Sequence, residues 1–234
     1  VEPQPRLRAR LTGHGCYGGS CECAVPGHTE VVNVQRPEPA MTRPAILNDR
    51  HYTYADYLKF PEDERWEIID GVAYNMSPSP AERHQGLSSE LHTQIGNQLR
   101  GKPCRVYSAP FDVRFEASET TNKVVQPDLL VVCDRSKITG GGLVGAPDWI
   151  IEILSPRTAG KDQIVKRQLY EANGVREYWL IQPFDKVVTV YRLGTDGSYG
   201  IPDISEMTGK LTVTAVPGLE IDWDLWQPLD IDAR

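Results

Sequence analysis

From residue 53 onward, apolar positions along the chain recur first at helical spacing and then in strand-like runs. Thr53 precedes ADYLKF (55–60), and a threonine N-cap before apolar residues at helical spacing predicts a short helix. The segment WEIIDGVAYNMSP (66–78) has apolar runs on either side of Asp70-Gly71. Because Asp-Gly favours the tight turns of hairpins, this segment predicts two paired strands.

Two later segments predict longer helices. In the first, apolar residues recur every four positions and the pattern ends near Gly101, a residue type that commonly terminates helices. The apolar positions of this helix are Leu87, Leu91, Ile95 and Leu99. The second segment, GKDQIVKRQLYEANG (160–174), predicts a helix that stops at Gly174.

The remaining apolar runs predict strands. They are a strand pair in 105–116, two nearly continuous apolar runs at 129–132 and 149–154, and two strands in 175–183 and 186–194. The alternation of helices and strands predicts an α/β (α+β) fold with a mixed central β-sheet flanked by helices. We expect the two most apolar strands to be central and covered on both faces.

Residues 1–45 have a different composition, rich in Gly, Pro and Arg, without sustained periodicity. This predicts a disordered leader before a single folded domain over 46–234. Normal-looking sequence begins at Met41, which suggests the hypothesis that the leader is upstream sequence read through from a misplaced start. Five residues of the leader are of metal-binding types, but their spacing matches no paired zinc pattern, so disorder is favoured. They are His14, Cys16, Cys21, Cys23 and His28.

Of the 234 residues, 40% are hydrophobic and 24% are charged, as in soluble globular proteins. No apolar run reaches the roughly eighteen residues of a membrane span, and the pattern of a signal peptide is missing, so a cytoplasmic location is the default expectation. The formal net charge of −7 argues against tight metal-free binding of DNA, which requires a basic surface. It argues less against a metal-dependent nuclease, because acidic ligands hold the ions.

The cysteines do not indicate a disulfide framework. Five cysteines at uneven spacing leave one unpaired in any complete pairing. Cys104 and Cys133 lie in apolar surroundings and are predicted to be reduced thiols of the core.

Two acidic residues interrupt the most apolar strands. Asp128 stands at the start of one strand and Glu152 lies inside the other, where lone carboxylates are rare unless they are paired or bind metal. Two carboxylates that converge near strand ends form a hard-oxygen site suited to Mg²⁺ or Mn²⁺. Such an ion polarises a phosphoryl oxygen and lowers the pKa of a bound water, which yields a nucleophile near neutral pH.

The same acids form part of a wider family pattern. Pro127-Asp128, followed by Glu152-Ile153-Leu154, resembles the core of the PD-(D/E)xK nucleases. More narrowly, the chain resembles the Uma2 group of restriction endonucleases. The similarity spans most of 53–195 and is carried by WEIIDG (66–71), MSPSPAERH (76–84), PDLLVV (127–132), WIIEILSP (149–156), the stretch from Asp162 to Lys166, and YEANGVREYWLI (170–181).

This resemblance implies a restriction-endonuclease-like fold and a metal ion held by Asp128, Glu152 and the backbone carbonyl of Ile153. It also implies a site role for Glu67, which matches an acidic residue that precedes the core in many such nucleases and holds a second ion or a water. The competing interpretation places Glu67 on the exposed face of its strand, because Trp66 and Ile68 alternate with it.

The chain departs from the nuclease pattern at Leu154, where the third motif position is normally lysine. Leu154 shares a strand face with Glu152, and the loss of a cation there removes several kcal/mol of transition-state stabilisation. Lys166 is the natural substitute, because it follows Asp162 at i,i+4 spacing on the next helix and the Uma2 pattern generally has this lysine. The alternatives are an exposed lysine paired with Asp162, or a buried ion pair with Glu152.

Three further residues are candidates for contact with the substrate. Gln126 directly precedes the Pro-Asp pair and is placed to orient the substrate. Asp162 faces the same way as Lys166. His84, at the start of a helix, either caps that helix or contacts phosphate at its N-terminus.

These features predict a Mg²⁺- or Mn²⁺-dependent endonuclease that hydrolyses phosphodiester bonds in DNA. The alternative is a catalytically weak or inactive module on the nuclease fold that binds nucleic acid or protein, which Leu154 and the acidic charge favour. A homodimer suits cleavage of both strands of a duplex. Trp223 and Trp226 belong either to its contact surface or to the monomer's own core. No serine-hydrolase or Walker phosphate-binding motif is present in the sequence.

Overall fold

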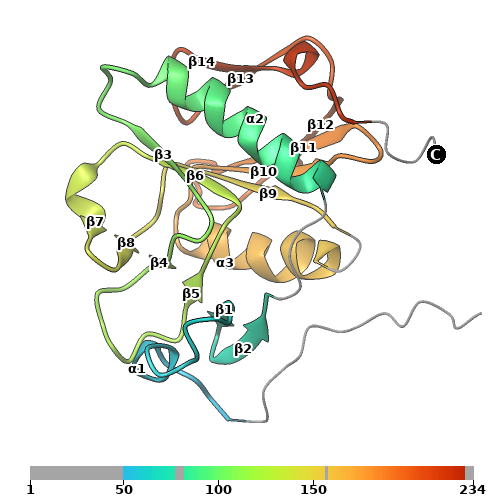
Figure 1. Ribbon diagram of the computed structural model, residues 1–234. Helices are drawn as coiled ribbons and strands as arrows, with labels where there is room; N and C mark the ends of the chain where they lie inside the picture. The colour runs from blue at the N-terminus through green and yellow to red at the C-terminus, as the bar shows by residue number, and fades with distance from the viewer. Residues whose placement is uncertain (1–49, 77–81, 156–157, 230–234) are drawn as a thin grey trace, which may run out of the picture. The chain divides into compact units, whose positions relative to one another are not determined.

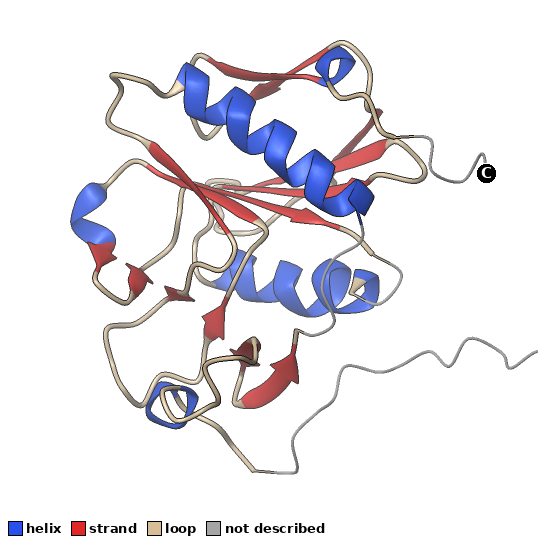
Figure 2. Cartoon of the chain, viewed as in Figure 1, coloured by secondary structure: helices blue, strands red, loops and turns tan. Residues whose placement is uncertain are grey.

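A computed structural model describes residues 50–76, 82–155 and 158–229. The expected leader over 1–45 lies outside these residues, so the leader and the proposed domain boundary stay predictions. In the described part of the chain, helices flank a mixed β-sheet, which confirms the predicted α/β (α+β) fold class (Figure 1 and Figure 2). No helix among these residues is both long enough and apolar enough to cross a membrane.

The central sheet has six strands and is mixed, because β9 and β10 run parallel while all other neighbours are antiparallel. Its order is β12 (Asp203–Glu206), β11 (Val187–Arg192), β10 (Glu177–Gln182), β9 (Trp149–Ile153), β6 (Leu129–Val132) and β3 (Arg105–Ser108). The apolar runs predicted as inner strands are β6 and β9, and every residue of both is buried. Their placement inside the sheet is confirmed.

A helix covers each face of the central sheet, α2 (Glu82–Gln98) on one side and α3 (Arg167–Ala172) on the other (Figure 1). Successive strand residues point to opposite faces, and the two cores follow this alternation. Ile151 and Ile153 pack with the leucines of α2, whereas Ile150 and Leu154 pack with residues of α3. Burial on both faces explains why these strands are continuous apolar runs in the sequence.

A second six-stranded sheet, which the sequence did not predict, carries Glu67 in β1. Its order is β2 (Val72–Asn75), β1 (Trp66–Ile69), β5 (Val124–Val125), β4 (Val113–Arg114), β8 (Gly142–Val144) and β7 (Ile138–Thr139). The predicted hairpin of β1 and β2 is confirmed, and Asp70 and Gly71 at its turn have φ values of 49° and 83°. Such left-handed values are those that a tight hairpin turn requires. The short helix α1 (Tyr54–Tyr57), capped by Thr53, precedes this hairpin.

Two predicted elements differ from the structure. The strand pair expected in 105–116 is not a hairpin, because β3 belongs to the central sheet and β4 to the second sheet. The helix expected over 160–174 begins as a π-helix, η2 (Lys161–Lys166), and continues as α3. It stops at Gly174 as predicted, where a φ of 78° ends the helix.

The C-terminal segment packs against α2. Its strands β13 (Lys210–Val213) and β14 (Leu219–Asp222) pair with each other, and the side-chain amides of Gln94 and Gln98 bond to the backbone of β14. Trp223, in the short helix η3 (Trp223–Leu225), is only 3% exposed, and Trp226 packs against the same core. Both tryptophans therefore serve the monomer's own core, and the homodimer stays a prediction. The remaining short helix is η1 (Arg135–Lys137).

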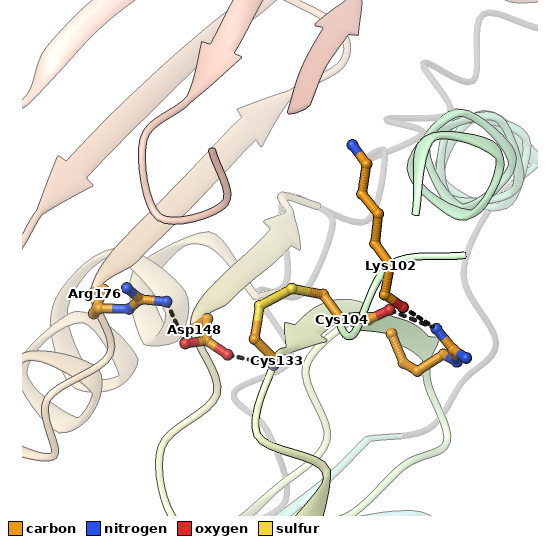
Figure 3. Close-up of a disulfide and its surroundings, with 6 residues drawn as sticks. Lys102, Cys104, Cys133, Asp148 and Arg176 are labelled. Atoms are coloured by element: carbon orange, nitrogen blue, oxygen red, sulfur yellow. Dashed lines mark hydrogen bonds and ion pairs between the residues drawn. A yellow bond between two sulfur atoms is a disulfide. The ribbon is translucent and has the colours of Figure 1, made fainter. Parts of the chain in front are cut away.

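Cys104 and Cys133 form a disulfide, so the prediction of two reduced thiols is wrong (Figure 3). Antiparallel pairing of β3 with β6 sets Arg105 opposite Val132, which brings the two cysteines opposite each other one position further on. Beside the bond, the carboxylate of Asp148 accepts a hydrogen bond from the backbone of Cys133. The pairing register decides this bond, and the spacing of cysteines along the chain does not reveal it.

We expect reduction of this disulfide to lower the free energy of unfolding by about 2–4 kcal/mol, because the bond restricts an unfolded loop with a sequence separation of 29. The measurement is urea-induced unfolding with and without a reductant. The double variant Cys104→Ala, Cys133→Ala should unfold at one urea concentration in both buffers. Identical unfolding midpoints for the reduced and oxidised wild-type protein would contradict this expectation.

Candidate active site

The site lies where β6 and β9 of the central sheet meet, close to Asp128 and Glu152. The strands are antiparallel with Leu129 opposite Ile151, so Asp128 stands opposite Glu152 one position further along. Opposed residues of antiparallel strands place their side chains on the same face. The sheet register therefore brings the two predicted acids together, although they are far apart along the chain.

Asp128 is half-buried and is bound by two neighbours. Its Oδ2 accepts the backbone N–H of Ile153 at 2.8 Å and lies 3.0 Å from Nε2 of His84. Burial lowers the pKa of His84, but the hydrogen bond and charge of Asp128 outweigh burial, so the net shift of this pKa is upward. Three of the predicted site residues thus meet at the start of α2.

Glu152 is buried in β9 and accepts hydrogen bonds from the helix that covers this face. Nζ of Lys166 and the hydroxyl of Tyr170 both donate to Oε1 of Glu152, each at 2.8 Å. Leu154 lies on the same face but packs among the apolar residues around α3. The third motif position is therefore apolar, and the ammonium group that reaches Glu152 comes from η2.

Glu67 is fully buried in β1, and both of its carboxylate oxygens accept hydrogen bonds. Oε1 lies 2.7 Å from Nζ of Lys166 and accepts the backbone N–H of Gln126 at 3.0 Å, while Oε2 accepts Nζ of Lys161 at 2.6 Å. Burial by itself raises the pKa of Glu67, but the two ammonium groups outweigh burial and lower this pKa to about 2. The interpretation of Glu67 as an exposed strand residue is wrong.

The π-helical turn explains how two lysines reach one carboxylate. In an α-helix, residues five apart do not face each other, whereas the i→i+5 bonds of a π-helix bring them into line. Lys161 and Lys166 are five apart in η2, and both contact Glu67. Asp162 of the same turn is buried, with Oδ1 at 3.7 Å from Nζ of Lys166, so the two predicted neighbours face the same way. Lys166 is 1% exposed, and its interpretation as a surface lysine is wrong.

These buried charges, which we call the acid–lysine cluster, do not balance. Its members are Glu67, Glu152, Asp162, Lys161 and Lys166. With Asp128 included, four carboxylates and two ammonium groups carry a formal charge of −2. Burial raises the pKa of Glu152 to about 8 against the opposing charge of Lys166, and the neighbouring carboxylates add to the rise. Burial raises the pKa of Asp162 as well.

The side chain of Gln126 forms its hydrogen bonds with residues outside the acid–lysine cluster. Its amide nitrogen donates to the hydroxyl of Tyr57 at 3.0 Å and to Asp112 at 2.9 Å, and its oxygen accepts Nε–H of Arg65 at 3.0 Å. Each polar atom of this amide thus has a partner within the protein, and only the backbone N–H reaches the cluster, at Glu67. A role of Gln126 in orienting substrate stays a prediction.

The oxygen atoms at this end of β6 and β9 fit a hard divalent cation. The carboxylates of Asp128 and Glu152 and the carbonyl of Ile153 are the donor type that Mg²⁺ prefers. Across the described residues, no three side chains of His, Cys, Asp or Glu come together as a metal site. Mg²⁺ commonly takes one or two carboxylates and keeps several waters, so a donor set with one backbone carbonyl suits it.

A polar groove with a volume of about 290 Å³ opens beside Asp128. One wall is the face of α2 that includes His84, and the opposite wall includes Arg65 and Ser108. Asp128 therefore borders a space that a substrate can enter, whereas Glu152 is buried behind it and is not part of the groove lining.

The profile of the Uma2 family, "Putative restriction endonuclease", matches residues 54–224. The chain belongs to the Uma2 family. The match includes both six-stranded sheets and the whole acid–lysine cluster, so the resemblance seen in the sequence is confirmed.

Two further proteins are similar to this Uma2 chain. An uncharacterized protein from Synechocystis sp. is 28% identical over 147 residues, which cover 62% of this chain and 75% of that protein. The crystal structure of "a putative nuclease belonging to DUF820" from Anabaena variabilis superposes with a TM-score of 0.60 at 24% identity. It covers 74% of this chain and 96% of the other. At that identity the second comparison shows a shared fold.

Two residues of this Uma2 site escaped the sequence analysis, Lys161 and Tyr170. Tyr170 follows Lys166 by four positions, a spacing that places both on one helix face and that was visible in the sequence. Lys161 has no such signal, because α-helical spacing turns it away from Lys166 and only the π-helix aligns the two.

The two buried glutamates have opposite effects on how stability depends on pH. Glu67, with its pKa lowered to about 2, contributes stability that is present above its unfolded pKa of 4.5 and is lost as the pH falls towards 2. Glu152, with its pKa raised to about 8, contributes stability that is fully present below 4.5 and is lost as the pH rises through 8.

In metal-free buffer, the unfolding free energy of the wild-type protein should decline between about pH 5 and pH 8, because Glu152 holds a proton in the folded state but not in the unfolded state. We expect Glu152→Gln to decline less steeply, because it removes this titration. The contribution removed is at most about 1.4 kcal/mol per pH unit. Urea unfolding across this range measures it. Glu206→Gln, on the exposed strand β12, is the control and should keep the wild-type decline, since it leaves the acid–lysine cluster unchanged. Equal slopes for Glu152→Gln and wild type would refute the assignment.

Proposed function

We propose that this Uma2 protein is a metal-dependent endonuclease that hydrolyses phosphodiester bonds in DNA. The observation that carries the proposal is the meeting of Asp128 and Glu152 at the ends of two central strands, beside the buried ammonium of Lys166. Oxygen donors for a metal and a fixed cation are the groups that stabilise negative charge in phosphoryl transfer. Membership of a family described as restriction endonucleases supports the same activity.

In this proposal, Asp128, Glu152 and the carbonyl of Ile153 hold Mg²⁺ or Mn²⁺. When bound, a divalent ion polarises a phosphoryl oxygen and lowers the pKa of its water. Carboxylates outnumber ammonium groups by four to two when Asp128 is counted with the acid–lysine cluster. The donor chemistry and this excess of carboxylates both suit a cation.

We assign to Lys166 the part of the motif lysine that Leu154 replaces. Its ammonium lies 2.8 Å from Glu152 and 2.7 Å from Glu67, so its position does not depend on the third motif position. Held there, it places positive charge beside the phosphate and the attacking water without reorganisation during the reaction. Glu67 is then a positioning residue for Lys166, in place of the second ion that the resemblance implied.

His84 contributes from the side of Asp128. Its Nε2 is engaged with Asp128, and the backbone of Ile153 is a further hydrogen-bond partner of the ring. His84 also lines the groove beside Asp128. An imidazole at this position suits contact with a phosphate oxygen.

A second function is favoured by one observation, the apolar surroundings of Leu154. A module that has lost catalysis retains the fold and uses Lys166 only to neutralise buried carboxylates. Titration calorimetry with Mn²⁺ distinguishes the two functions. If the protein is an enzyme, it should bind Mn²⁺, and Asp128→Asn should abolish this binding. If it is an inactive module, wild type and Asp128→Asn should give the same heat of titration.

We expect the purified protein to nick and linearise supercoiled plasmid DNA in the presence of Mg²⁺ or Mn²⁺. Asp128→Asn and Glu152→Gln should each lower the cleavage rate by about 10²–10³-fold, the loss typical when one stabilising group is removed. Gel electrophoresis of timed samples measures the rate.

Glu206→Gln is the matched control for these substitutions. Glu206 is exposed on β12, three strands away from β9, so its variant should cleave at the wild-type rate. Equal cleavage by Asp128→Asn and wild type, or no cleavage by any protein with either metal, would sink the proposed activity.

The proposed role of Lys166 is tested against its neighbour Lys161. Lys166→Met removes the ammonium from both Glu67 and Glu152 and should lower the cleavage rate by about 10²–10³-fold. Lys161→Met removes an equally close ammonium from Glu67 but none from Glu152, and should retain most activity. Circular dichroism and unfolding midpoints identify loss of fold. Equal losses of rate in two folded variants would show that Lys166 has no special role.

A further inference from the structure

The groove beside Asp128 has an unusual helical wall. The side chains that line it from α2 are His84, Gln85, Ser88, Ser89, His92 and Thr93. Their spacing of three and four residues places them on one face of α2. None of these side chains is acidic or apolar, although the chain as a whole carries a net charge of −7.

The opposite wall adds a single cation. Arg65 lines the groove, and only its Nε is engaged with Gln126 in the described contacts. Asp128 is the one acidic residue in the lining, and it lies at the end next to the acid–lysine cluster. The groove therefore combines neutral hydrogen-bonding side chains with one guanidinium group and leads directly to the proposed metal ligands.

One polar atom of a groove residue is left without a partner within the described residues. Nδ1 of His92 is buried and makes no hydrogen bond, and the residue lines the groove. Buried polar atoms normally have a partner, and a bound ligand is one source of it. His84 and His92 both line the groove and are eight residues apart, about 12 Å along the helix axis.

We propose that this groove binds the sugar–phosphate backbone of one nucleic-acid strand where it leaves the site of cleavage. The inference rests on the proposed nuclease function and specifies which part of the substrate the helix contacts. Hydroxyl, amide and imidazole groups with one arginine are typical donors to phosphate and sugar oxygens, and such contacts carry no base sequence. About 12 Å of helix is long enough to contact consecutive phosphates of one strand.

The composition of the groove determines how strongly its affinity for nucleic acid depends on salt concentration. Neutral donors release no counterions, so they add affinity without adding to its salt dependence. Arg65 is the only arginine or lysine in the groove lining, and we expect it to dominate the salt dependence. An acidic protein can thus hold its substrate through a groove whose one acidic lining residue is Asp128, a proposed metal ligand.

The first test introduces charge into the groove of the full-length protein. Fluorescence anisotropy measures binding of a labelled single-stranded oligonucleotide in Ca²⁺ buffer. Thr93→Glu should raise Kd by about tenfold or more, because a carboxylate then faces the phosphates. Thr195→Glu is the matched control and should bind as wild type. Thr195 is exposed just beyond the end of β11, and the strand register places that end away from Asp128.

The second test separates hydrogen bonding from charge. The double variant Ser88→Ala, Ser89→Ala should raise Kd by about three- to tenfold with an unchanged dependence of log Kd on log salt. Arg65→Ala should reduce the slope of that dependence by about 0.7, the value for one phosphate of a single strand. A general loss of folding would not leave the slope unchanged in the serine variant and reduce it in Arg65→Ala.

The outcomes distinguish this inference from the proposed function. If wild type cleaves plasmid while Thr93→Glu and Thr195→Glu bind the oligonucleotide equally, the groove assignment is overturned and the nuclease function stands. If Thr93→Glu alone weakens binding, the groove is supported, whether or not cleavage is observed. Equal affinity of wild type and the double serine variant also counts against the groove.

Discussion

One buried ammonium group connects the parts of this structure. Lys166 is 1% exposed and lies 2.7 Å from Glu67 of the second sheet and 2.8 Å from Glu152 of the central sheet. The π-helix η2 thus joins both sheets through a single charge. Transfer of such ions out of water costs several kcal/mol each and is offset only by close contacts and further hydrogen bonds. Lys161 supplies those bonds at Glu67, and Tyr170 supplies them at Glu152.

A core of this kind is not needed for stability alone, because apolar residues of similar volume are often equally stabilising. The acid–lysine cluster therefore fits a chemical role better than a purely structural one. Charges held rigidly away from water require no reorganisation when negative charge develops on a substrate. The division between a charged buried cluster and a neutral polar groove agrees with such a role. The cluster would act on the phosphate, and the groove would hold the strand that carries it.

The strongest patterns in the sequence predicted their elements well. The runs at 129–132 and 149–154 became β6 and β9, and the Asp70-Gly71 turn became a hairpin. These elements depend on local periodicity and turn chemistry, which are visible in a single sequence. The second sheet was missed because three of its strands, β4, β5 and β7, contain only two residues each. Strands that short show no measurable alternation.

The sequence by itself determined the residue types of the site and the strands that carry Asp128 and Glu152, because a carboxylate within a buried apolar run requires a cation or a hydrogen-bond donor beside it. Only the tertiary structure decided which groups meet. The register between β6 and β9 set the acids opposite each other, and the π-helical turn aligned Lys161 with Lys166 on Glu67. Register and helix type depend on contacts between segments far apart in the chain, and no local pattern encodes them.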